Sequence, residues 1–173
     1  MTSALLASTW LFAEETKPSE YQVEATYLYN FGRFVQWPAN TSANSFAVCV
    51  LGQDPFGSAL DATLSGESLD GKPVVIRRVV KAQDATTCQI LFINANEDAR
   101  LREILTVLDG NSVLTVSDMA GFSRRGGMIQ FLLDGGRVRF EVNLSSAENA
   151  RLTLSSELLK VATTVRKNAR SGD

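Results

Sequence analysis

The stretch "SFAVCVLG", residues 45–52, decides the fold class, because it is a continuous apolar run that ends at a glycine. Strands that are buried on both faces of a parallel sheet have this pattern. Three further runs predict strands of the same kind: "KPVVIRRVV" at 72–80, "CQILFINA" at 88–95 and "NSVLTVSD" at 111–118. The sequence therefore predicts a sheet built largely from parallel strands.

Helices are predicted between these strands. The clearest is "NEDARLREILTVLDG", residues 96–110, whose leucines and isoleucine recur three or four positions apart. Asn96 can cap its start and Gly110 can end it. An earlier helix is predicted just before Pro38, and a short one within residues 54–64. Strands that alternate with helices are typical of a sheet with helices on both faces.

The C-terminal part changes character. "GMIQFLLDGGRVRFEVNL", residues 127–144, has two strand-like runs around Asp-Gly-Gly, which predicts an antiparallel hairpin. Two helices should follow, one opened by a capping box of Ser145 and Glu148, and one running from Ser155 or Ser156 to about Arg166. The predicted fold is α/β, with a mostly parallel Rossmann-like sheet, helices on both faces and an antiparallel hairpin at one edge.

Composition is consistent with one ordinary globular domain. The chain has 173 residues, of which 45% are hydrophobic and 21% charged. We expect the domain at 20–167 and a polar tail at 168–173. The net charge of -2 gives no bulk attraction to nucleic acid. Residues 1–13 resemble the end of a secretory signal peptide cut after Ala13, although an apolar N-terminal arm would have the same composition.

The residue types present exclude most catalytic chemistry. The chain contains no histidine, which rules out Ser-His-Asp and Cys-His nucleophilic systems within it. Its two cysteines, Cys49 and Cys88, are too few for a zinc site. We therefore expect no catalytic residues, no metal and no cofactor. The cysteines could form one disulfide or remain two buried thiols; export would favour the disulfide.

Two glycine-rich segments in the first half could be taken for ligand loops. "GQDPFG", residues 52–57, follows a predicted strand, so Asp54 and Phe56 could contact a ligand there, although Asp-Pro is also ordinary turn chemistry. "GESLDGK", residues 66–72, has the spacing of a phosphate-binding loop, but Pro73 occupies the place of the required Ser or Thr. The second segment is therefore predicted to be a connecting turn.

A third segment is basic. In "GFSRRGGM", residues 121–128, Arg124 and Arg125 could hold a phosphate or a carboxylate, and the glycines would allow close backbone approach. A solvated loop between two strands is the simpler interpretation. Together with residues 54–57, residues 124–127 would form the site of a small-ligand-binding domain, which is the alternative function that we consider.

The segment "EATYLYNFGRFVQWP", residues 24–38, is the most aromatic part of the chain. Its helical spacing places one set of rings on a single face, which we expect to pack on the sheet: Tyr27, Phe31 and Phe34. A second set points elsewhere and forms the predicted partner surface: Tyr29, Arg33 and Trp37. The aromatic content thus indicates mostly core, with a smaller exposed set.

Five segments together carry a family resemblance: "YLYNFGRFVQWP", "CVLGQDPFG", "ILFI", "VLTVSDMAGFSRRGGMIQF" and "RVRFEVNL". In order and spacing they are similar to the YfiR-type family of bacterial periplasmic proteins, from about Glu20 to Val165. The resemblance implies that the protein is not an enzyme but a periplasmic repressor, which binds the periplasmic sensor part of an inner-membrane diguanylate cyclase and inhibits it. It also implies that an outer-membrane lipoprotein can sequester the repressor, which raises cyclic di-GMP and favours biofilm.

The resemblance also carries expectations about particular residues. Cys49 and Cys88 match a family cysteine pair that is joined as a disulfide. A second pair found in some relatives falls on Ser123 and Gln130, so a redox switch that depends on it should be absent here. We expect a periplasmic protein that inhibits its partner by direct contact, can form a homodimer and binds no nucleic acid.

Overall fold

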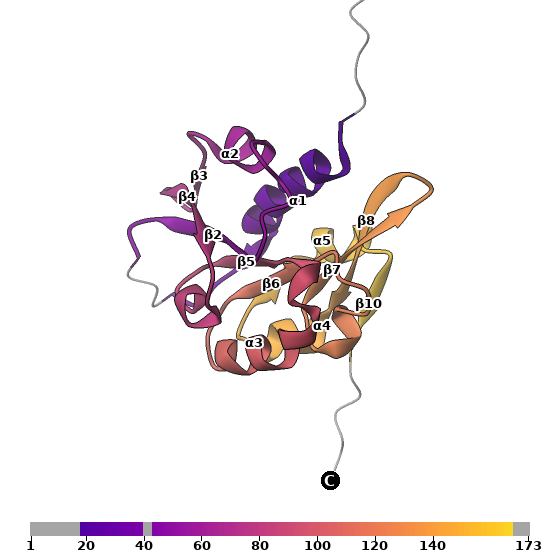
Figure 1. Ribbon diagram of the computed structural model, residues 1–173. Coiled ribbons are helices and arrows are strands. Elements are labelled where there is room, and N and C mark those ends of the chain that lie inside the picture. Colours follow the sequence, from indigo (N-terminus) through magenta and orange to yellow (C-terminus); the bar gives the residue numbers. More distant parts are fainter. Residues whose placement is uncertain (1–17, 40–42, 168–173) are drawn as a thin grey trace, which may run out of the picture.

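The computed structural model describes residues 18–39 and 43–167, so the predictions for residues 1–13 and 168–173 lie outside the described residues (Figure 1). Within the described ranges the main sheet has eight strands in the order β10-β8-β7-β6-β5-β2-β4-β3. Their bounds are β2 Phe46–Leu51, β3 Ser68–Leu69, β4 Lys72–Val79, β5 Ile90–Ile93, β6 Leu114–Ser117, β7 Ile129–Asp134, β8 Arg137–Asn143 and β10 Thr164–Arg166. A separate antiparallel pair joins β1 (Val35–Gln36) to β9 (Thr153–Leu154).

The predicted parallel sheet is confirmed. β2 pairs in parallel with both β4 and β5, and β5, β6 and β7 continue in parallel. All six residues of β2 are buried, as the apolar run predicted. β7 and β8 form the predicted antiparallel hairpin, and β10 pairs in parallel with β8. The sheet is therefore mostly parallel with one hairpin near an edge.

Helices cover both faces of the sheet, again as predicted (Figure 1). One face packs against α1 (Glu20–Phe34), α2 (Ala59–Leu64), α4 (Leu144–Asn149) and α5 (Ser156–Val161). The other face packs against α3 (Leu101–Leu108) and the 3-10 turn η1 (Ala82–Ala85). Because side chains alternate along a strand, Val48 and Val50 of β2 face the first group while Cys49 and Leu51 face the second.

Helix α1 is the main cover of its face. Ser19 caps it through a capping box with Gln22, and the helix ends at Phe34, four residues before Pro38. Phe31 is fully buried, and its ring lies 5.8 Å from that of Phe131 on β7 and 5.2 Å from that of Phe140 on β8. The aromatic segment is thus largely core, which confirms the prediction for this face.

Three local predictions at the helices were wrong. The last helix ends at Val161, and the chain then re-enters the sheet as β10 because β-branched Thr163, Thr164 and Val165 favour a strand. β10, and not the hairpin, is therefore the edge of the sheet. The short helix α4 is capped by Asn143, whose Oδ1 accepts from Ser146 N at 3.0 Å, and not by Ser145.

The helical run before α3 also differs in detail. It opens as a 3-10 segment, η2 (Ala95–Arg100), and Asn94 caps it by accepting from Asn96 N at 2.8 Å. Residues 66–72, which have the spacing of a phosphate-binding loop, form β3 and the turn into β4. This confirms the prediction of a connecting turn. No helix within residues 18–39 and 43–167 is long and apolar enough to cross a membrane.

Candidate functional site

The carboxyl ends of the parallel strands meet along one edge of the sheet. The chain leaves β2, adds β4 on one side, and then crosses back to add β5 on the other side. This reversal makes the β2–β5 boundary a topological switch point, where open α/β sheets commonly bind ligands. The loops that follow β2, β5 and β6 therefore define the place to examine first.

Three polar side chains, Tyr21, Glu24 and Asp118, lie together near this edge, and we call them the carboxyl cluster. Asp118 directly follows β6, while Tyr21 and Glu24 lie on the first turns of α1. Tyr21 Oη donates to Asp118 Oδ2 at 3.4 Å. Glu24 is only 1% exposed, and among the described residues neither its Oε2 nor Oδ1 of Asp118 has a hydrogen-bond partner. The cluster thus contains two buried carboxyl oxygens without a hydrogen-bond partner.

Burial dominates the electrostatics of this cluster. Removal from water raises the pKa of Glu24 to about 8, and the negative charges of Asp118 and Glu20 add to the effect. Burial likewise raises the pKa of Asp118 and of Tyr21. Glu24 is therefore largely protonated at neutral pH. A carboxyl with so perturbed a pKa at a switch point is typical of functional sites, although structural groups can show it as well.

The predicted ligand loop after β2 lies beside the carboxyl cluster. Phe56 of this loop makes the contact. The centroid of its ring is 5.8 Å from that of Tyr21 and 4.8 Å from that of Phe92 on β5. Contact of Phe56 with a ligand stays a prediction, but the residue is only 4% exposed and its ring packs into the core. The physical reason is the Asp-Pro turn, in which Asp54 Oδ1 accepts from Phe56 N at 2.8 Å and the ring folds under the loop.

The charged side chains of the two predicted ligand loops already have partners. Arg78 on β4 donates to Asp54 at 2.7 Å and to Asp61 on α2 at 2.5 Å. Arg125 pairs with Asp98 and also donates to its backbone carbonyl at 3.0 Å, whereas Arg124 is exposed. A ligand at either loop would have to replace these ion pairs.

The predicted partner surface lies toward the opposite end of α1. Tyr29 Oη donates to Glu67 at 3.0 Å, and the guanidinium of exposed Arg33 lies 5.8 Å from the ring of Phe34. Trp37 is half-buried, and its ring packs edge to face with that of Phe46, which opens β2, at a centroid distance of 5.1 Å. These residues therefore gather near the start of β2, whereas the carboxyl cluster lies beyond the ends of the strands.

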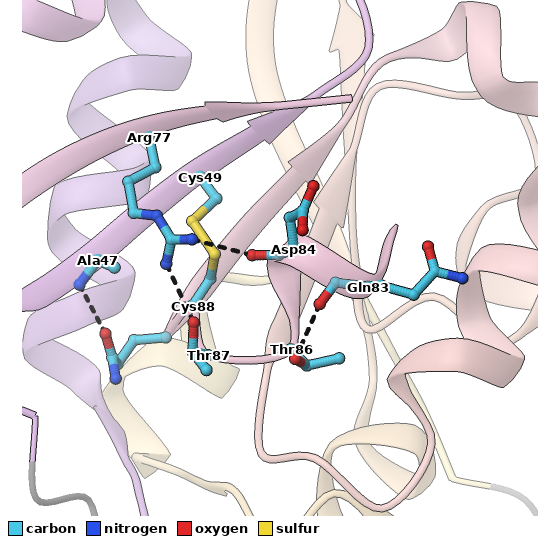
Figure 2. Close-up of a disulfide and its surroundings, with 9 residues drawn as sticks. Ala47, Cys49, Arg77, Gln83, Asp84, Thr86, Thr87 and Cys88 are labelled. Carbon is cyan, nitrogen blue, oxygen red and sulfur yellow. Dashed lines mark hydrogen bonds between the residues drawn. A yellow bond between two sulfur atoms is a disulfide. The ribbon is translucent and has the colours of Figure 1, made fainter. Parts of the chain in front are cut away.

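The two cysteines form a disulfide, as predicted. Cys49 lies on β2 and Cys88 in the turn before β5, with their Cα atoms 6.1 Å apart (Figure 2). Both are buried, and Figure 2 shows Arg77 of β4 beside the bond, where it donates to Thr87 at 3.0 Å and to the carbonyl of Asp84 at 3.1 Å. The bond links neighbouring strands inside the core and is shielded from reductants.

The disulfide and sheet agree with what comparison with known proteins finds. The model of the YfiR/HmsC-like family matches residues 21–163, almost all of the described domain. The chain belongs to the YfiR/HmsC-like family. This membership supports a regulatory, non-catalytic role in the periplasm, where disulfides form readily.

A solved structure shares the fold. It is the crystal structure of a conserved domain protein from Vibrio cholerae O1 biovar El Tor strain N16961, with a TM-score of 0.59 and 11% sequence identity. The match covers 86% of this chain, which spans about 60% of the length of that protein. At this identity the likeness concerns the fold alone.

In this YfiR/HmsC-like chain a second buried polar group occupies the positions matched to the extra cysteine pair, Ser123 and Gln130. Ser123 N donates to Gln130 Oε1 at 3.1 Å, so these two residues do lie side by side. Ser123 Oγ also donates to Glu141, and Arg166 of β10 donates to Ser123 at 3.3 Å and to Glu141 at 3.4 Å. We call Ser123, Glu141 and Arg166 the arginine cluster.

Sequence reasoning missed the carboxyl cluster, although a signal was present. Glu24 lies on the same helical stripe as Leu28, Phe31 and Val35, which are all buried. An acid on the apolar face of an amphipathic helix is the pattern that would have revealed it.

Among the described residues no group of three or more His, Cys, Asp or Glu side chains could hold a metal ion.

Proposed function

We propose that this chain inhibits an inner-membrane diguanylate cyclase by binding the periplasmic domain of the enzyme, and so lowers cyclic di-GMP. The observation that carries the proposal is the family match over residues 21–163. The buried disulfide supports it, because such bonds persist in the oxidising periplasm. An outer-membrane lipoprotein that sequesters the chain would relieve the inhibition.

We place the contact with the cyclase at the edge of the sheet near the β7–β8 hairpin. Three of the large apolar side chains that are exposed lie there: Leu133 on β7, Val161 at the end of α5 and Val165 on β10 are 59%, 65% and 40% exposed. β8 pairs with both β7 and β10, so it joins the strands that carry Leu133 and Val165. Exposed apolar groups on neighbouring elements favour contact with another protein.

The test is a cyclic di-GMP measurement in bacteria that co-express the exported chain with candidate membrane diguanylate cyclases. The native chain should lower cyclic di-GMP with its cyclase partner, and Val161→Lys should restore it, because a charge on the contact surface disfavours docking. Val80→Lys is the matched control, since Val80 is 80% exposed but follows β4 near the opposite edge. This control should inhibit as the native chain does.

The residues near the start of β2 provide a second arm. If Arg33→Glu restores cyclic di-GMP while Val161→Lys does not, the contact lies on the predicted surface of Tyr29, Arg33 and Trp37 instead. Capture of the cyclase from detergent-solubilised membranes by the purified chain is the physical counterpart. An abundant, folded chain that neither captures any membrane cyclase nor changes cyclic di-GMP overturns the proposal.

The alternative function, a small-ligand domain built on residues 54–57 and 124–127, has less support. Asp54 and Arg125 are each held in an ion pair, and Phe56 is buried. A ligand would have to displace these partners before it bound. Ligand chemistry is better supported at the neighbouring carboxyl cluster.

A further inference from the structure

We propose that the carboxyl cluster of Tyr21, Glu24 and Asp118 is a binding site for the primary ammonium group of a small amine. The proposal does not depend on the inhibitory function, because it rests on this cluster alone. Its starting point is the pair of buried oxygens, Glu24 Oε2 and Asp118 Oδ1, that have no donor among the described residues. A buried acceptor without a donor is costly, so a donor that arrives with a ligand would be favoured.

The hydrogen-bonding pattern of the cluster matches an ammonium group. Tyr21 already donates its hydroxyl proton to Asp118 Oδ2, which leaves the phenol oxygen able to accept. Together with the two oxygens that lack donors, this gives three acceptors. An alkylammonium carries three N–H donors and no acceptor, so each of its donors would have a partner.

The charge of the cluster also calls for a cation. The charges that act on Glu24 are those of Asp118 and Glu20, and both are negative. Arg78 of β4 is already engaged with Asp54 and Asp61, and Arg125 of the loop after β6 with Asp98. An ammonium group would supply the missing positive charge.

The surroundings favour an amine with a short alkyl part over a metal ion. Calcium takes six to eight oxygen ligands and magnesium an octahedral set, which two carboxyls and a phenol do not provide. Tyr21 of the cluster meets Phe56 edge to face, and Phe56 meets Phe92 in the same way, with ring centroids 5.8 Å and 4.8 Å apart. These rings offer an apolar wall to an alkyl chain.

The groups that face Glu24 also fix the pH range of binding. They are Glu20 and Tyr21 on its own helix and Asp118 on the loop after β6. Because the pKa of Glu24 is about 8, an ammonium group must displace its proton below that pH. Alkylamines stay protonated up to about pH 10, as lysine does. Affinity should therefore rise from pH 6 to pH 8 and hold up to about pH 10.

Thermal melting of the full chain with n-propylammonium chloride at pH 8.5 tests the proposal. Propylammonium should raise the melting temperature by several degrees at saturation, because it binds only the folded state. Tetramethylammonium chloride at the same concentration has the charge without N–H donors and should give no shift. Equal shifts with both salts, or no shift up to about 100 mM propylammonium, overturn the proposal.

Two variants make the test specific. Glu24→Gln keeps the shape of the side chain and removes its charge, so the propylammonium shift should vanish while circular dichroism stays native. Glu103→Gln removes an exposed acid of α3 and should leave the shift unchanged. An NMR titration of the Glu24 carboxyl carbon should show a lower pKa with propylammonium than without it. A shift that survives in Glu24→Gln places binding elsewhere and refutes the site.

Discussion

The carboxyl cluster and the arginine cluster are both polar groups built into an apolar domain, yet they are completed differently. In the arginine cluster, Arg166 supplies a positive charge and donors to Glu141 and Ser123. In the carboxyl cluster, Glu24 and Asp118 are brought together, and the charges of the described residues that act on Glu24 are all negative. A buried polar cluster whose members satisfy one another's hydrogen bonds stabilises the fold. A cluster that keeps unpaired acceptors indicates a role other than stabilising the fold.

Removal of the disulfide should have the largest effect on the stability of the protein, and the effects of the other substitutions are compared with it. Cys49 and Cys88 are 39 residues apart, and closing such a loop contributes about 4 kcal/mol in the chain-entropy model. Cys88→Ser should therefore lower the melting temperature by about 10 °C. Calorimetry of the double variant Cys49→Ala, Cys88→Ala controls for the free thiol and should show a similar loss. An unchanged melting temperature would mean that packing alone holds β2 to β5.

Glu24→Gln should have the next largest effect, and it should be stabilising. The pKa of Glu24 is about 8 in the folded protein and near 4.5 in the unfolded chain, so the folded state binds the proton more tightly between these values. Native stability should fall as pH rises from about 4.5 to about 8 and change little above that. The variant lacks this loss and should exceed the native chain by roughly 3 kcal/mol at pH 8.

Urea denaturation at several pH values measures this difference. Glu103→Gln, on the exposed side of α3, is the matched control and should follow the pH dependence of the native chain. If native and Glu24→Gln curves run parallel from pH 4.5 to pH 8, then the carboxyl cluster is satisfied in solution and the contrast with the arginine cluster disappears.

Arg166→Met should destabilise the protein by about 2 kcal/mol, because it leaves the largely buried Glu141 without its cation. The double variant Arg166→Met, Glu141→Gln removes both charges and should recover part of the loss. Hydrogen exchange should show faster exchange at β10 in the single variant. If the double variant is no better than the single one, the ion pair is not what completes this cluster.

Tyr21→Phe should have the smallest effect, below about 1 kcal/mol, because the lost hydrogen bond is 3.4 Å long and only half-buried. That bond lowers the pKa of Asp118, so its removal should raise this pKa further. Carbon-detected NMR titration of the aspartate carboxyl groups measures the change. An unchanged pKa of Asp118 would show that the phenol and the carboxylate do not interact.

The difference between the clusters also marks the limit of sequence reasoning. The sheet was predictable because apolar runs such as residues 46–51 report burial directly, and the hairpin because Asp-Gly-Gly fixes a turn. The end of α5 was not, since helix and strand compete over a few residues and pairing of β10 with β8 decided the outcome. The burial of Phe56 was not predictable either, because it depends on where the turn directs the ring.

The role of a polar residue is harder to predict than the position of a strand, because it depends on neighbours that are distant in the sequence. Glu24 and Asp118 are 94 residues apart, and nothing local indicates that they meet. The cysteines were easier, because the chain has only two of them and a family pairing to match. A charge on the apolar stripe of a helix remains the one local sign that would have directed attention to Glu24.

The two edges of the sheet have a consequence for colloidal behaviour. Polymerisation of sheet proteins into fibrils requires a long, flat edge with free backbone groups. On one side the last strand, β10, is only three residues long and ends in Arg166. On the other side β3 covers only the first two residues of β4, and the rest of that strand carries Arg77 and Arg78 behind Pro73. Short edges, proline and like charges disfavour the edge-to-edge pairing from which fibrils grow.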